Sequence, residues 1–440
     1  MRKHRRRTAL TAAALLAGVV TALSACGSSG GSAPGTPGAS GPATGTLRFV
    51  GPEEPKTFEP VIAGFEAENP GIQVEYTQVP FDQLNNVLQQ RLAAKDSSID
   101  VYTVDQPRLS ALAARGFLVD LSDLREKVRQ AVVPGQYEVN VFRDKMWAVP
   151  IWTSDQFLFY NAALLKKAGV TPPSRDPAQR WTWEQVAEAG KKAQEKAGAQ
   201  WAVIPEQIEQ FYQLQSLAES AGGGPGITGP DMLTPAITTD GWIKAMTWYH
   251  DLFANKLAPR GVGSFQTSPL FSEGKVAFFV GGPWDVGVFG AVKDLDWGIA
   301  PHPYFAGGKQ VTPTGSWSWG INPASTQQAM ARKFLEYASL DPEGNLLTTK
   351  NTTIIPSNKA AFDTYLPTLD ALAGDKSKGV GEILTYDAGN TAVARPTSVG
   401  YIQFEEIMTK AFADIRNGAD PRARLEKATG EIKTAWAQLR

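Results

Sequence analysis

Cysteine and histidine are scarce in this chain. Cys26 is the only cysteine in 440 residues, and beyond the first 25 residues the only histidines are His250 and His302. The chain after Cys26 therefore has no disulfide, no thiolate metal site and no cysteine nucleophile, and two histidines do not make a His-rich metal centre. We expect neither a metal nor a cofactor, and a catalytic histidine has only these two candidates.

Two sequence patterns match known catalytic or phosphate-binding motifs, but neither has the surroundings that its chemistry needs. Residues 27–31 (GSSGG) match G-x-S-x-G, yet they lie in a run of small polar residues where no strand-to-helix turn exposes a nucleophile. Residues 224–229 (GPGITG) match G-x-G-x-x-G, but Pro230 follows and no clear helix begins there, whereas a phosphate site needs a helix N-terminus. The sequence thus marks no catalytic residue.

Several aromatic and polar residues stand in loops after predicted strands, where α/β proteins collect ligand-binding side chains, and we add Tyr212 in QFYQL and Arg395 before the closing helices. The aromatic candidates are Trp152, Trp284, Trp317 and Tyr212. The polar candidates are Glu53, Glu54, Asp105, Gln106, Asp155 and Arg395. Flat rings can cover the apolar face of a pyranose, and carboxylates, amides and Arg can bond its hydroxyl rim. These residue types favour a sugar site, with interior packing or a solvated loop as the alternative for each.

Other tryptophans are predicted to be structural. Thr182 and Gln185 form a capping-box pattern at the start of a helix, with Trp181 and Trp183 beside it. Trp242, Trp248 and Trp436 fall within helical patterns, where a role in the core is expected.

Strand and helix signals alternate along the chain and must position these residues. A helix-like stretch at 60–69 lies between two strand patterns, LRFV and IQVEY, and a further buried strand, IDVYTV, comes before another helix pattern. The alternation resumes with FLFY, the helix after Thr182 and KVAFFV, and the chain closes with amphipathic helices from Tyr401 to Asn417 and from Pro421 onward. This order predicts an α/β fold with a mostly parallel sheet covered on both faces. The roughly 395 residues from 46 onward exceed one ordinary core, so we expect two domains.

Residues 1–25 have the pattern of a secretory signal peptide. Residues 1–7 carry five Lys and Arg, and the Ala-rich run that follows ends in Leu23-Ser24-Ala25-Cys26. This ending resembles the lipobox of bacterial lipoproteins, in which the cysteine is lipidated and becomes the first residue of the mature chain. We predict lipidation of Cys26. The alternative is a plain signal peptide with an incidental cysteine, and Arg5-Arg6-Arg7 leaves twin-arginine export open.

Residues 26–45 are almost entirely Gly, Ser, Ala, Pro and Thr, a composition that predicts a flexible tether between Cys26 and the folded part. The whole chain has 43 Lys and Arg against 44 Asp and Glu, and the signal peptide contains five of the basic residues and no acid. The remaining chain is acidic, so a nucleic-acid partner is not expected.

Five segments, taken in order, resemble the extracellular solute-binding proteins of carbohydrate ABC importers, the group that contains maltose-binding protein. They are DVYTVDQPRLSALAARGFLVDLS, MWAVPIWTSDQFLFYNAALLKKAGVTPP, WTWEQVAEA, FSEGKVAFFVGGPWDVGVF and TGSWSWGINPAS. The resemblance extends over nearly all of residues 46–440. It implies a monomeric, non-enzymatic receptor outside the cytoplasm that binds a sugar and delivers it to the transmembrane subunits of an ABC permease. The lipid on Cys26 would anchor it to the cell membrane.

The resemblance also implies two discontinuous α/β lobes that close on the ligand by a hinge motion. The expected lobes are 46–152 with 314–352, and 153–313 with 353–440. The connecting strands should cross near Pro150 to Asp155, Thr312 to Ser318 and Asn351 to Pro356.

Two other functions stay open from the sequence. One is a lipid-anchored glycoside hydrolase with a pair of carboxylates in a similar cleft. The other is a binding protein for an amino acid or peptide, whose carboxylate Arg395 could bond.

Overall fold

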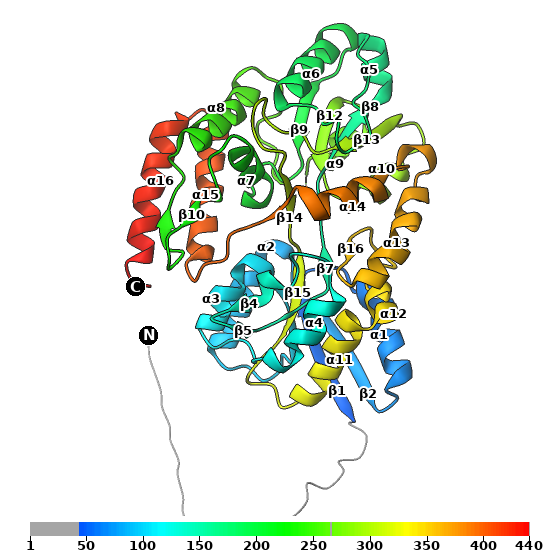
Figure 1. Cartoon of the computed structure of the whole chain (residues 1–440), viewed down its shortest axis with the longest axis vertical. Helices are drawn as coiled ribbons and strands as arrows, with labels where there is room; N and C mark the ends of the chain where they lie inside the picture. Colours follow the sequence, from blue (N-terminus) through cyan, green and yellow to red (C-terminus); the bar gives the residue numbers. More distant parts are fainter. Residues whose placement is uncertain (1–43, 265, 440) are drawn as a thin grey trace, which may run out of the picture. The chain divides into compact units, whose positions relative to one another are not determined.

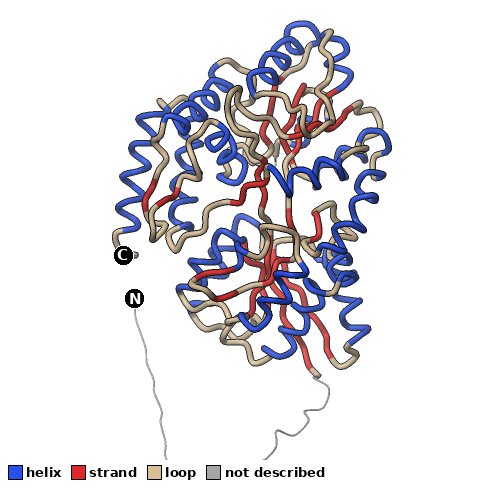
Figure 2. The backbone as a smooth tube through the Cα atoms, in the orientation of Figure 1, coloured by secondary structure: helices blue, strands red, loops and turns tan. Residues whose placement is uncertain are grey.

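The computed structural model describes residues 44–264 and 266–439, and their larger strands gather into two sheets (Figures 1 and 2). The predicted signal peptide, Cys26 and nearly all of the predicted tether lie outside these residues. The last tether residue, Gly45, is the first residue of strand β1 (Gly45–Gly51). No helix of the described part is long and apolar enough to cross a lipid bilayer.

The first sheet has the strand order β2-β1-β3-β15-β6. Besides β1 it contains β2 (Ile72–Gln78), β3 (Val101–Asp105), β6 (Val149–Pro150) and β15 (Trp317–Ile321). Strand β1 is parallel to β2 and β3, whereas β15 is antiparallel to β3 and β6. Phe49 on β1 anchors the core, with ring centroids 4.4 Å from Trp319 and 5.2 Å from Phe58.

Helices from two stretches of sequence complete this first lobe. They are α1 (Pro55–Glu68), α2 (Phe81–Ala93), α3 (Leu109–Ala114), α4 (Arg125–Ala131), α11 (Gln328–Leu340) and α12 (Pro342–Leu347). Helix α1 begins at Pro55, five residues before the predicted stretch. A proline at the first helical position loses no hydrogen bond, because that N–H has no partner within the helix.

The second sheet has the strand order β13-β8-β12-β9. Its strands are β8 (Phe157–Asn161), β9 (Trp201–Pro205), β12 (Val276–Gly281) and β13 (Trp297–Pro301). Strand β8 runs antiparallel to β12 and β13, and only β12 and β9 are parallel. The expectation of a mostly parallel sheet is therefore wrong. A local βαβ crossover forces parallel strands, but β8 and β15 each enter their sheet from the other lobe and are free of that constraint.

The helices of the second lobe include the predicted C-terminal pair. They are α5 (Ala162–Ala168), α6 (Trp183–Ala197), α7 (Phe211–Ser220), α8 (Asp240–Ala254), α9 (Ser268–Ser272), α10 (Trp284–Gly290), α13 (Lys359–Ala371), α14 (Val380–Asn390), α15 (Tyr401–Arg416) and α16 (Pro421–Trp436). The capping box of α6 is confirmed, because Thr182 Oγ1 accepts from Gln185 N and Gln185 Oε1 accepts from Thr182 N. The predicted cap of α16 is confirmed by the bond from Ala423 N to Asp420 Oδ1.

Short strand pairs lie where the chain passes between the sheets. Strand β7 (Trp152–Thr153) follows β6 and pairs with β16 (Ile355–Pro356). Strand β14 (Thr312–Thr314) precedes β15 and pairs with β17 (Ala392–Ala394). These passages fall at the three predicted crossings, and the residue limits of the two lobes stay a prediction.

Close packing of α6 on β9 makes Gly190 a test of the fold. A Cβ at Gly190 would lie 2.7 Å from the Ala202 side chain and 2.8 Å from its carbonyl oxygen, whereas one at Gly430 in α16 would meet nothing within 4 Å. Gly190→Ala should lower the free energy of unfolding by about 1–3 kcal/mol through overpacking. Gly430→Ala should raise it by roughly 0.5–1 kcal/mol, because alanine loses less entropy in a helix. Urea unfolding of both variants measures these changes, and equal effects would contradict the packing.

Candidate ligand-binding site

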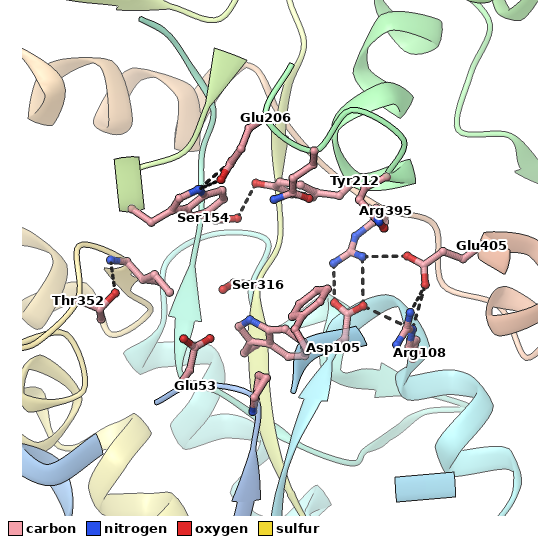
Figure 3. A pocket seen from close by; sticks show the side chains of 17 residues that line it. Glu53, Asp105, Arg108, Ser154, Glu206, Tyr212, Ser316, Thr352, Arg395 and Glu405 are labelled. Atoms are coloured by element: carbon pink, nitrogen blue, oxygen red, sulfur yellow. Dashed lines mark hydrogen bonds and ion pairs between the residues drawn. The ribbon is translucent and has the colours of Figure 1, made fainter. Parts of the chain in front are cut away.

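A cavity of ≈ 340 Å³ is lined by segments that belong to both lobes (Figure 3). Six of the ten predicted ligand-binding residues line it: Glu53, Asp105, Tyr212, Trp284, Trp317 and Arg395. Most of them stand just after a strand or at the first residue of the next element, which is where sequence reasoning looked for them. Their contact with a ligand stays a prediction.

Trp152 does not line the cavity, and its predicted place in a binding site is corrected by the structure. Its side chain is fully buried in the core of the first lobe, where it stacks on Phe58 at 5.4 Å between ring centroids. Its indole Nε1 donates to Thr348 Oγ1 at 2.8 Å. Successive side chains of a strand point to opposite faces, and β7 turns this residue toward the core.

Three polar candidates also lie outside the cavity lining. Glu54 is exposed and pairs with Lys56, with 2.6 Å between Oε2 and Nζ. Gln106 is buried and donates from Nε2 to Gln136 Oε1 at 2.7 Å. Asp155 is only 5% exposed and accepts from the backbone N of Gln156. Each of the three has a local partner and does not face the cavity. The neighbouring residues in the sequence do not indicate which way these side chains point.

Sequence reasoning missed several lining residues. Glu206 directly follows β9, so the same strand-end argument applied to it. Arg108 lies in a 3₁₀ turn (Gln106–Arg108) and Glu405 lies within α15. A charged residue in a helical pattern is normally solvated, so neither position carried a signal. Phe81 opens α2 and places its ring edge-on to Trp317, with centroids 5.6 Å apart.

Four charged side chains form an ion cluster at one wall of the cavity. Arg395 Nη2 lies 2.5 Å from Asp105 Oδ1, and Arg395 Nη1 lies 3.1 Å from Asp105 Oδ2. Arg395 Nη1 also lies 3.4 Å from Glu405 Oε1. Arg108 bonds Glu405 Oε2 through Nε and Nη2, and its Nε lies 3.6 Å from Asp105 Oδ2. The two acids and two arginines thus balance in charge, and Arg108 Nη1 and Arg395 Nε are the guanidinium nitrogens of the cluster that have no hydrogen-bond partner among the described residues.

The pKa values follow from this pairing. Burial alone would raise the pKa of Glu405, but the charges of Arg108 and Arg395 outweigh burial and lower it. Burial would lower the pKa of Arg395, and Asp105 reverses that effect and raises it. The pairing thus favours the ionised forms of Glu405 and Arg395.

A second feature is the indole of Trp284, which is held in place by Glu206. Trp284 Nε1 lies 2.7 and 2.8 Å from the two carboxylate oxygens of Glu206 (Figure 3). A Cβ at Gly282 would fall 2.4 Å from the indole ring, so glycine is required beneath it. The ring also packs against the core of the first lobe. Trp284 thus presents a fixed aromatic surface at the cavity.

Glu206 has an acidic neighbour, Asp285, and forms no ion pair with a basic residue in the described part of the chain. Burial, and then the charge of Asp285, raise the pKa of Glu206 far above its usual range. Asp285 is itself buried, accepts from Ser268 Oγ at 3.0 Å, and also has a raised pKa because of burial. Burial and the mutual repulsion of the two carboxylates thus favour protonation of this pair.

Glu53 lines the cavity from the first lobe. Its backbone oxygen accepts from the Tyr76 hydroxyl at 2.8 Å, which fixes the loop after β1. Burial, and then the charge of Glu54, raise the pKa of Glu53 to about 7. Tyr212 lies on the second lobe, with its hydroxyl 2.9 Å from Ser154 Oγ and its ring 5.3 Å from the Arg395 guanidinium.

Within residues 44–264 and 266–439 no three His, Cys, Asp or Glu side chains are grouped to hold a metal ion.

The sequence model for bacterial extracellular solute-binding proteins matches residues 51–344, which is more than half of the chain. The chain belongs to this family. Membership accounts for the two α/β lobes and for a cavity lined by both of them. The family consists of solute-binding proteins, and its description places them outside the cell.

Relatives of this solute-binding protein include two with named ligands. It is 25% identical to the maltodextrin-binding protein MdxE of Bacillus subtilis over 276 residues, which cover 60% of this chain and 61% of MdxE. That is less than two thirds of MdxE. It is also 25% identical to the diacetylchitobiose binding protein DasA of Streptomyces coelicolor, over 85% of this chain and 87% of DasA.

The fold of this solute-binding protein is shared by solved structures. The substrate-binding protein Lmo0181 of Listeria monocytogenes, in complex with cycloalternan, superposes with a TM-score of 0.77. The sequences are 21% identical, and the match covers 89% of this chain and 99% of that one. This similarity supports the two-lobed architecture.

The ion cluster predicts a large loss of stability when Arg395 is removed. Arg395→Met leaves Asp105 buried without its bidentate partner, so the free energy of unfolding should fall by roughly 3–5 kcal/mol. Arg422 is exposed on α16, and Arg422→Met removes the same charge with an expected change within about 0.5 kcal/mol. Urea unfolding compares the two, and a loss below about 1 kcal/mol for Arg395→Met would contradict the cluster's role.

Asp155 predicts a pH-dependent stability. Burial raises the pKa of Asp155 to about 8, although the Gln156 N–H and the charge of Arg180 act against it. In the unfolded chain its pKa is about 4. Between these values the folded state holds a proton that the unfolded state lacks, so stability falls as pH rises, by at most about 1.4 kcal/mol per pH unit. Asp155→Asn removes this loss.

The stability gained in Asp155→Asn should therefore grow between pH 5 and pH 8 in thermal and urea unfolding. Exposed Asp375→Asn serves as the matched control and should show a small, pH-independent difference. A constant difference for Asp155→Asn would show that the folded carboxyl titrates normally.

Proposed function

We propose that this protein is a receptor outside the cytoplasm that binds a sugar or oligosaccharide in the cavity and delivers it to an ABC permease. The observation that carries the proposal is the fixed indole of Trp284 beside a cavity that also exposes Trp317, Glu53 and Glu206. Such a surface can cover the apolar face of a pyranose and bond its hydroxyls. The ligands named for MdxE and DasA are carbohydrates, which supports the same class here.

Binding is proposed to close the two lobes around the sugar without chemical change to it. The expected lobe limits, 46–152 with 314–352 and 153–313 with 353–440, agree with the short strand pairs at the passages between the sheets. Closure would bring Trp317 and Trp284 against the ligand from different lobes. The transmembrane subunits of the permease would recognise the closed form.

The site of action follows from the N-terminal sequence. We propose that residues 1–25 are removed, that Cys26 is lipidated, and that residues 26–45 tether a monomeric receptor to the outer face of the cell membrane. Mass spectrometry of the protein purified from its native membrane would detect a diacylglyceryl group on Cys26, and an unmodified or absent Cys26 would rule the anchor out.

Calorimetric titration of the purified protein with mono-, di- and oligosaccharides tests the function, with chromatography of each mixture afterwards. Saturable binding with the sugar intact is the expected result. Release of a smaller sugar would show that the protein is an enzyme. No detectable binding of any sugar tested would favour a non-sugar solute.

Trp284→Ala should raise the dissociation constant for the bound sugar at least tenfold, a loss of about 1.4 kcal/mol or more, because the aromatic surface is removed. Trp152→Phe should keep the dissociation constant within about twofold but lower the free energy of unfolding by about 2 kcal/mol, because Trp152 is a core residue. Calorimetry and urea unfolding separate these effects. If Trp152→Phe weakened sugar binding and Trp284→Ala did not, the sequence-based prediction that Trp152 binds the ligand would be supported.

A further inference from the structure

The charges that line the cavity divide into a matched set and an unmatched set. Arg108, Arg395, Asp105 and Glu405 neutralise one another in the ion cluster. The two remaining lining carboxylates belong to Glu53 and Glu206, and no described Lys, Arg or His forms an ion pair with either. The cavity therefore carries acidic groups in excess of basic ones.

The groups packed against these two acids supply no compensating charge. Around Glu206 they are the indole N–H of Trp284, the carboxyl of Asp285 and the Thr267 hydroxyl, which donates to the Glu206 backbone oxygen. Around Glu53 the charged or titratable groups are Glu54 on the same loop and Tyr76 on β2. Lys56, the second residue of α1, pairs with Glu54.

Glu206 orients Trp284, but the neutral indole N–H does not balance the charge of an ionised carboxylate. Glu206 is buried and Glu53 is half-buried, so an ionised carboxylate at either position loses hydration that no ion pair restores. In Figure 3 Glu206 projects from the upper wall and Glu53 from the lower wall, so the two acids approach the same cavity from different lobes. Each acid is therefore neutralised either by its own proton or by a cation that the cavity holds.

We propose that the sugar bound here carries a protonated amine and that Glu53 and Glu206 select it. This inference rests on the proposed function, since it names the class of sugar for the same cavity. An ammonium group supplies a positive charge and three hydrogen-bond donors to an ionised acid, whereas the hydroxyls of a neutral sugar supply hydrogen bonds but no charge. The faces of Trp284 and Trp317 also attract a cation.

The protonation of the acids gives the ligand a further signature. Burial raises the pKa values of both acids, which favours their protonated forms. An ammonium binds the ionised acid better, so affinity for the amine rises as pH increases from 5.5 to 7. A sugar amine with a pKa near that of an α-amino group, about 8, keeps its charge over this range.

Matched pairs of sugars test the proposal by calorimetry at pH 7. Each pair is a free amine and its N-acetyl form, taken from glucosamine, galactosamine and glucosamine oligomers of two to four units, with maltose and maltotriose as neutral references. One free amine should bind at least tenfold more tightly than its acetylated partner and than both references. Its affinity should rise several-fold between pH 5.5 and 7.

Variants that remove the charge of Glu53 or Glu206 test whether these residues cause the preference for a free amine. Glu206→Gln and Glu53→Gln should each reduce the amine preference to about threefold or less, and the double variant should also abolish the pH dependence. Glu188→Gln removes the same charge from an exposed position on α6 and should leave preference and affinity unchanged. If Glu206→Gln fails to fold, Glu53→Gln still tests the assignment.

The outcomes separate this inference from the proposed function. Binding of an acetylated or neutral sugar as tightly as, or more tightly than, every free amine overturns the inference and leaves a sugar receptor. An amine preference that survives in both variants overturns the assignment to Glu53 and Glu206. If no sugar binds measurably, both the inference and the proposed function are overturned.

Discussion

The cluster of Asp105, Arg108, Arg395 and Glu405 is the interaction on which the cavity depends. Its members come from the end of β3, the turn after it, the segment after β17 and helix α15. Each acid is 8% exposed at its side chain, too little for water to stabilise its charge, so each must have a guanidinium within reach. This requirement fixes how the first lobe meets the second at this wall, because an arginine of each lobe contacts an acid of the other.

Chain topology explains why such a cluster can form here. The chain leaves the first sheet after β6, returns at β15 and leaves again before β16, so the ends of both sheets are connected by short segments at the cavity. Residues that follow β1, β3, β9 and β17 are thereby brought together from across the sequence. Strands β8 and β15 follow these passages between the lobes, and both run antiparallel to their neighbours. For this reason neither sheet is fully parallel, as sheets built only from local βαβ units would be.

Local chemistry in the sequence predicted much of the fold and part of the site. Period-two strands, the capping box of Thr182 and Gln185 and the Asp420 cap depend on neighbouring residues, so a single sequence contains the information. The site depends on which side of a strand or loop each residue faces. Glu53 and Glu54 are adjacent, yet one lines the cavity and the other pairs with Lys56 in solvent. Trp152 and Trp317 both stand at strand ends, yet one packs on Phe58 and the other lines the cavity. These differences are set by packing between distant segments, as is the pairing of Arg108 with Glu405.

The same reasoning distinguishes charges that hold the protein together from charges that face a ligand. The sequence predicts Arg395 as a partner for a ligand, and its guanidinium lines the cavity while it also pairs with Asp105 and Glu405. Glu206 was not chosen, and its carboxylate orients the aromatic surface of Trp284 while it lacks a cation of its own. A strongly paired buried charge has little free energy left to gain from a ligand, because exchanging partners returns only the difference between two good interactions. An unpaired buried charge gains the full compensation when a ligand supplies it. Under the proposal made above, selectivity therefore lies in Glu53 and Glu206, which have no ion-pair partner among the described residues, and the ion cluster forms the wall beside them.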